Sequence, residues 1–174
     1  MKPKKPALSI SRGAAPAGET VRMSYAEVLR RNGALLALAQ PWRKLPTITS
    51  ELKVAARMRD LRDAVEEYNK IREKYVATYN DDVMALAGES AAQVKDRQAK
   101  AIEVGKKMSE LDEKLVAVPV PVARIVQADL PVALKGVIKL PDGSIVDGEQ
   151  NARGIAGIVA DLGDLYDETS EAKA

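Results

Sequence analysis

The stretch from residue 51 to residue 81 contains neither Gly nor Pro, and it constrains the fold more than any other part of the chain. Its apolar residues recur in steps of three and four, the spacing that places side chains on one face of a helix. At ~1.5 Å rise per residue, the stretch predicts one helix about 45–50 Å long. The apolar stripe consists of Val54, Met58, Leu61, Val65, Tyr68, Ile71, Tyr75 and Tyr79.

A second long helix is predicted over residues 90–115. Ser90 and Gln93 have the spacing of a capping box at a helix start, and an apolar stripe again follows in steps of three and four. Two long helices with matching stripes and a short polar connection predict a long antiparallel helical hairpin. We expect the seam between its helices to comprise Val54, Met58, Leu61, Val65, Tyr68, Val104, Met108, Leu111 and Leu115.

Shorter elements are predicted on either side of the hairpin. Ser24 and Glu27 form a second capping-box pattern, so we expect a short first helix that ends at about Gln40, before Pro41. Alternating Val and Pro after residue 116 predict an edge strand or an extended strap. Residues 132–148 then predict a β-hairpin that turns at residues 141–143, and residues 149–168 an amphipathic helix. The fold class is therefore mostly α (α+β).

The chain divides into three parts by composition. Residues 1–22 are rich in Pro, Gly and basic residues and predict an extended arm; residues 23–118 form the helical domain; residues 119–174 hold the strap, the β-hairpin and the last helix. Aliphatic residues must fill the core, because the chain has no Phe and a single Trp. Since small aliphatic side chains bury little area each, we expect this thin core to gain stability by pairing with another chain.

Several chemistries are excluded because the chain has no Cys and no His. Zinc sites of Cys and His cannot form, and no imidazole base exists. Asp161, Asp164 and Asp167 are spaced by three in the last predicted helix and could hold Mg²⁺ or Ca²⁺, but solvated surface carboxylates explain this spacing better. We predict no catalytic residues, no metal site and no cofactor, and therefore no enzyme.

The charge is unevenly distributed along the chain. Residues 1–50 carry nine Lys and Arg against two Asp and Glu, whereas residues 119–174 carry five against nine. A basic front could contact an anionic polymer, a neighbouring subunit or only solvent. The arm residues that would contact a partner are Lys2, Lys4, Lys5 and Arg12. Tyr68, Tyr75 and Tyr79 could stack nucleic-acid bases, but a stripe at helical spacing is more often core.

The order of segments resembles a loose family of small, mostly uncharacterised proteins of tailed bacteriophages. The resemblance covers about residues 25–130. It is carried by "LRRNGALLALAQPWRKLP", the long charged helix that ends in "YNKIREKYVATYND", a second helix and the strap "VPVPVARIV". It implies a phage origin and a role in a virion or in its assembly, and it implies no established activity and no functional residues for this chain.

These observations lead us to expect a non-catalytic structural or assembly accessory protein of a bacteriophage virion. It would act through contacts with itself or with other phage structural proteins, in the virion or the host cytoplasm. The chain has no run of 18 apolar residues and no signal-peptide pattern, so we expect neither a membrane span nor secretion. The alternatives are a small nucleic-acid-binding accessory protein that uses the basic front, and a helical-hairpin chaperone.

The nucleic-acid alternative makes a direct prediction. If the basic front is the working surface, the protein binds DNA or RNA at low salt, and the affinity falls steeply between about 50 and 200 mM salt because bound counterions are released. Reversing the charges of Lys2, Lys4 and Lys5 should abolish the binding, which fluorescence anisotropy measures. A protein that binds no nucleic acid even at low salt would exclude this alternative.

Overall fold

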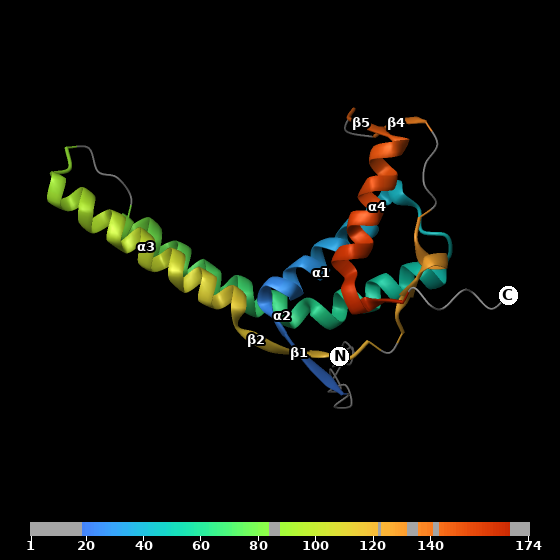
Figure 1. Ribbon diagram of the computed structural model, residues 1–174, viewed down its shortest axis with the longest axis horizontal. Coiled ribbons are helices and arrows are strands. Elements are labelled where there is room, and N and C mark those ends of the chain that lie inside the picture. The colour runs from blue at the N-terminus through green and yellow to red at the C-terminus, as the bar shows by residue number, and fades with distance from the viewer. Residues whose placement is uncertain (1–18, 84–87, 122, 132–135, 141–142, 168–174) are drawn as a thin grey trace, which may run out of the picture.

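The chain is mostly helical, as the sequence predicts. The computed structural model describes residues 19–83, 88–121, 123–131, 136–140 and 143–167. Helix α1 lies between α2 and α4. Helix α3 runs beside the C-terminal part of α2, and the two extend from the rest of the molecule as a projection that we call the distal projection (Figure 1). The α-helices within the described residues are α1 (Tyr25–Leu38), α2 (Ile48–Val83), α3 (Ala91–Glu113) and α4 (Gly148–Leu162).

Side-chain caps explain where the first two helices begin. The Ser24 hydroxyl accepts a hydrogen bond of 3.2 Å from the backbone N–H of Glu27, so α1 starts where the sequence predicts. Helix α2 begins at Ile48, three residues earlier than predicted. The Thr47 hydroxyl accepts a hydrogen bond of 3.1 Å from the N–H of Ser50 there and satisfies one of the free donors of the first turn.

The predicted capping box at the start of α3 is present. The Ser90 N–H donates to the Gln93 side chain at 2.8 Å, and the Gln93 N–H donates to the Ser90 hydroxyl at 3.4 Å. The predicted end of this helix is wrong, because α3 stops at Glu113 and Leu115 lies in a strand, 59% exposed. Strand pairing draws the chain away: the Tyr25 N–H donates to the Lys114 carbonyl at 3.1 Å.

The strands form three two-stranded sheets within the described residues. Antiparallel pairs join β1 (Thr20–Ser24) to β2 (Leu115–Pro119) and β4 (Val137–Lys139) to β5 (Ile145–Asp147), and a parallel pair joins β3 (Ile125–Val126) to β6 (Tyr166–Asp167). Residues 20–22, which we predicted to belong to the extended arm, are therefore paired. Residues 141 and 142 of the predicted β-hairpin turn lie outside the described residues, and Gly143 has a φ of 85°.

The register of β1 and β2 explains how a strand that contains Pro can pair. The Val120 N–H donates to the Glu19 carbonyl at 2.8 Å, which places Pro119 opposite Thr20 between two hydrogen-bonded pairs. The missing N–H of Pro119 would therefore point away from β1, so the ladder loses no hydrogen bond. As predicted from its Val and Pro pattern, this segment lies at the edge of its sheet.

The predicted last helix is too long at its C-terminal end. Helix α4 ends at Leu162 because Gly163 takes a φ of 56°, a left-handed conformation that Gly adopts at little cost. A short 3₁₀ turn, η3 (Gly163–Leu165), and strand β6 follow. The remainder of the predicted helix therefore turns back to pair with β3 instead of continuing along the surface.

Two tyrosine rings occupy the place where α1, α2 and α3 meet. The rings of Tyr25 and Tyr68 have centroids 5.5 Å apart, and the Tyr68 hydroxyl donates to Asp112 of α3 at 2.8 Å. Burial, with the Glu67 carboxylate nearby, raises the pKa of Tyr25 to about 12. Besides Tyr25, the largest fully buried apolar side chains among the described residues are aliphatic, namely Leu35, Leu38, Leu61, Ile125, Leu162, Val28, Val54 and Val118.

Leu61 tests whether the stripe of α2 is a packed core. Its side chain is 2% exposed, so Leu61→Ala should lower the free energy of unfolding by about 2–5 kcal/mol, through lost burial and the cavity left behind. Urea denaturation followed by circular dichroism measures this change. Leu52→Ala on the same helix is the control, because Leu52 is 66% exposed. Equal losses for the two variants would contradict the packing described here.

Candidate functional site

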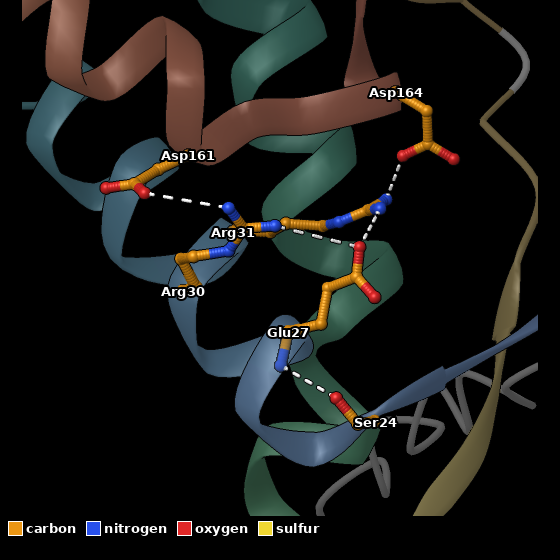
Figure 2. A network of polar contacts seen from close by, with 6 residues as sticks. All are labelled: Ser24, Glu27, Arg30, Arg31, Asp161 and Asp164. Atoms are coloured by element: carbon orange, nitrogen blue, oxygen red, sulfur yellow. Dashed lines mark hydrogen bonds and ion pairs between the residues drawn. The ribbon is translucent and has the colours of Figure 1, made fainter. Parts of the chain in front are cut away.

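The three aspartates considered as metal ligands do not share one helix face. Asp161 lies in α4, Asp164 in the 3₁₀ turn η3 and Asp167 in strand β6. Asp161 and Asp164 instead lie within reach of arginines of α1 (Figure 2), and Asp161 pairs with Arg30 at 3.8 Å. Among the described residues, no group of three or more Asp, Glu, His or Cys side chains is placed to hold a metal ion.

Arg31 is the centre of the ionic network that joins α1 to the end of α4 (Figure 2). Its side chain is buried, and its two terminal nitrogens form ion pairs with Glu27 of α1 and Asp164 of η3. A buried guanidinium is stable only when it is paired, so Asp164 must stay close to α1. The network therefore fixes α4 against one side of α1.

Asp129 fixes the strap against the beginning of α2. Its buried carboxylate accepts hydrogen bonds from the Ser50 hydroxyl at 2.9 Å and from the Val126 N–H at 3.0 Å, and it pairs with the Lys53 ammonium at 2.7 Å. Burial raises the pKa of this carboxyl, but the hydrogen bonds and the Lys53 charge lower it by more, so its pKa lies below the ordinary value. The first turns of α2 are thus held on this side.

The side of α2 that α1 covers only in part is hollowed. Two hollows of about 220 Å³ and 320 Å³ adjoin there, and Ala55 and Met58 line both of them. We call the two together the α1–α2 groove. Its remaining lining residues are Asn32, Leu38, Ala39, Gln40, Lys44, Leu45, Glu51, Val54, Arg59, Arg62, Val65 and Glu66.

Large apolar side chains stand exposed on the helices that border the α1–α2 groove. Ile48 and Leu52 of α2 are 75% and 66% exposed, and Leu36 of α1 is 45% exposed. Ile48, Leu52 and Ala55 follow one another in steps of four and three, so they share one face of α2. Apolar residues gathered beside an open groove are typical of a surface that binds another protein.

Charged side chains around the α1–α2 groove are free to meet a partner. Lys44, Glu51 and Arg59 form no ion pair with any other residue that the structure describes. Within the part of the chain that the structure describes, Arg62 pairs only with Asp63, at 3.9 Å between two well-exposed side chains. Because an exposed pair of this kind contributes little, these charges are available to select a binding partner.

The predicted seam residues are divided between two neighbours of α2. Lys114, directly after α3, pairs with Glu67 at 3.6 Å, so α3 reaches only as far as the middle of α2. Val54 and Met58 lie beyond it and line the groove with Leu38 of α1. Of the predicted seam, the buried members are Val54, Leu61, Tyr68 and Leu111, and the half-buried members are Met58, Val65, Val104 and Met108.

Of the residues considered for contact with nucleic acid, the structure describes the three tyrosines of α2. The arm residues Lys2, Lys4, Lys5 and Arg12 lie outside the described residues. Tyr68 is buried and hydrogen-bonded to Asp112, so its ring faces the core and is not available for stacking.

The α1–α2 groove was not predicted from the sequence. We predicted that the long helix begins at residue 51, which left Ile48 outside the helix that carries Leu52 and Ala55. A signal was present: Thr47 followed by Ser50 is a pattern of helix-capping residues, and Ile48 stands one turn before Leu52. The groove itself had no signal, because it depends on where α1 packs.

Comparisons with protein-family models, with curated proteins and with solved structures give no match to this chain. None of the helices in the part of the chain that the structure describes is long and apolar enough to cross a membrane.

The lowered pKa of Asp129 predicts a loss of stability in acid. A carboxyl whose pKa is lower in the folded protein contributes stability above its unfolded pKa and loses it as the pH falls through its folded pKa. Between neutral pH and about pH 2, the wild type should therefore lose more unfolding free energy than Asp129→Asn does. Denaturant titrations across this range measure it. Asp63→Asn, which removes an exposed carboxyl, should keep the wild-type slope.

Proposed function

We propose that this protein is a non-catalytic structural or assembly accessory protein of a bacteriophage particle, and that it acts through protein–protein contacts. The observation that carries the proposal is the α1–α2 groove, with the exposed side chains of Ile48 and Leu52 beside it. The phage setting rests on the order of segments over residues 25–130, which resembles small proteins of tailed phages.

The form of the groove favours a protein segment as its ligand. Its floor contains Leu38, Val54 and Met58, and its charged side chains belong to residues around it. An apolar floor with polar edges fits the way in which grooves bind the apolar face of a helix.

The distal projection formed by α2 and α3 supports the same proposal. In our proposal α2 and α3 act as an antiparallel helical hairpin, joined by the contact between Tyr68 and Asp112 at its base. Beyond that contact, no side chain that the structure describes between residues 69 and 110 is buried. Helices obtain most of their stability from packing, so the distal projection would be stabilised by lying against a neighbouring protein in an assembly.

Leu52 tests the role of the groove in assembly. Leu52→Glu places a charge beside the apolar floor, so the variant should be lost from purified phage particles or from their assembly intermediates. Quantitative mass spectrometry of gradient-purified particles measures its copy number against the wild type. Since Leu52 is 66% exposed, the change should leave the melting temperature nearly unchanged.

Ile145→Glu is the matched control for that experiment. Ile145 lies in β5 and is 65% exposed, so the control adds the same charge at a similarly exposed apolar site away from the groove. We expect this variant to be retained in particles at the wild-type level. A wild-type protein that is found neither in particles nor in assembly intermediates would contradict the proposed function.

A further inference from the structure

We propose that a second copy of this chain occupies the α1–α2 groove, with the two α2 helices antiparallel and crossing at Ala55. The inference rests on the proposed function, and it names one partner for the protein–protein contact made there. It follows from the pattern of size and charge along one face of α2, next to the groove.

Ala55 has the position and size that a crossing point requires. It lines both hollows of the groove, and its side chain is exposed. Because a methyl group is small, a second helix can approach the backbone of α2 closely at this point. Larger side chains lie one turn away on either side, namely Leu52 before Ala55 and Arg59 after it.

A twofold axis at Ala55 would make the apolar contacts complementary. In an antiparallel pair, residues at equal distances on opposite sides of the axis face each other. Leu52 would then face Met58 of the second copy, three residues from the axis in each chain. Leu52 is 66% exposed and Met58 is half-buried in the groove, so the exposed side chain of one copy fills the hollow of the other.

The charges select the same arrangement. Glu51 and Arg59 each lie four residues from Ala55, on opposite sides of it, so Glu51 of each copy would face Arg59 of the other. Neither side chain has an ion-pair partner among the described residues of its own chain. A parallel pairing in register would instead place Glu51 against Glu51 and Arg59 against Arg59, and like charges would oppose it.

Charge exchange tests the pairing. Glu51→Arg and Arg59→Glu each place like charges opposite each other twice in the dimer, so each single variant should weaken self-association by about tenfold. The double variant Glu51→Arg, Arg59→Glu restores opposite charges and should recover the wild-type dissociation constant. Sedimentation velocity over a concentration series measures the constant, and circular dichroism verifies that each variant is folded.

A cross-link tests the position of the axis independently. The natural chain has no Cys, so Ala55→Cys introduces a single thiol next to its symmetry mate. A short thiol-to-thiol cross-linker should convert this variant to covalent dimer. Asp63→Cys is the matched control on the same helix, because eight residues at ~1.5 Å each separate it from the axis. It should remain monomeric on a denaturing gel.

Two results would overturn the inference. The first is a wild-type protein that stays monomeric at every concentration, and the second is a double charge variant that associates no better than the single variants. If the protein is monomeric but Leu52→Glu is still lost from phage particles, the groove binds a different protein. In that case the second copy is excluded as the occupant while the proposed function stands.

Discussion

Helix α1 lies between α2 and α4, and one side of it makes the contacts on which the packing of these helices depends. Val28, Leu35 and Leu38 on this side are fully or almost fully buried, and Arg31 lies among them as a paired cation. Apolar burial supplies the energy of this packing, whereas the Arg31 ion pairs determine where the end of α4 can lie. A short helix thereby positions two others.

The α1–α2 groove is a consequence of this arrangement. Helix α1 ends at Leu38, and the connection to α2 turns back through Lys44 and Leu45, both of which line the groove. The strap is held to α2 at Ser50 and Lys53 by Asp129, so it leaves the groove uncovered. The chain thus presents apolar residues next to charges that have no ion-pair partner among the described residues, the combination that gives a protein interface both affinity and choice of partner.

The distal projection and the α1–α2 groove both indicate that this chain needs a neighbouring protein. The core contains no Phe, and the side chains described between residues 69 and 110 are at most half-buried. A protein of this kind leaves part of its apolar surface to be covered by neighbours. The proposed role in an assembly and the proposed pairing of two α2 helices both supply such neighbours, one from other proteins and one from the chain itself.

The mostly helical fold and the helix starts at Ser24 and Ser90 could be predicted from the sequence, because periodicity and caps are local properties. The errors at the start of α2 and at the end of α4 had local signals, in Thr47 and in Gly163, whereas the errors at the paired strands had causes distant in the sequence. Residues 20–22 pair with β2, and α3 ends before Leu115 because the chain joins that sheet. Helix α4 ends at Leu162, before Gly163, and the chain then returns to pair with β3. Strand pairing between distant segments has no local signature when the strands are this short.

The sequence alone determined which faces of the helices are apolar and which chemistries the absence of Cys and His excludes. It also placed Glu51, Leu52, Ala55 and Arg59 along one helix. Only the tertiary structure decided that Asp161 and Asp164 meet the arginines of α1 instead of a metal, and that Val54 and Met58 face α1. The physical reason is that periodicity defines a face, whereas the neighbour of that face depends on how all the helices share one thin core.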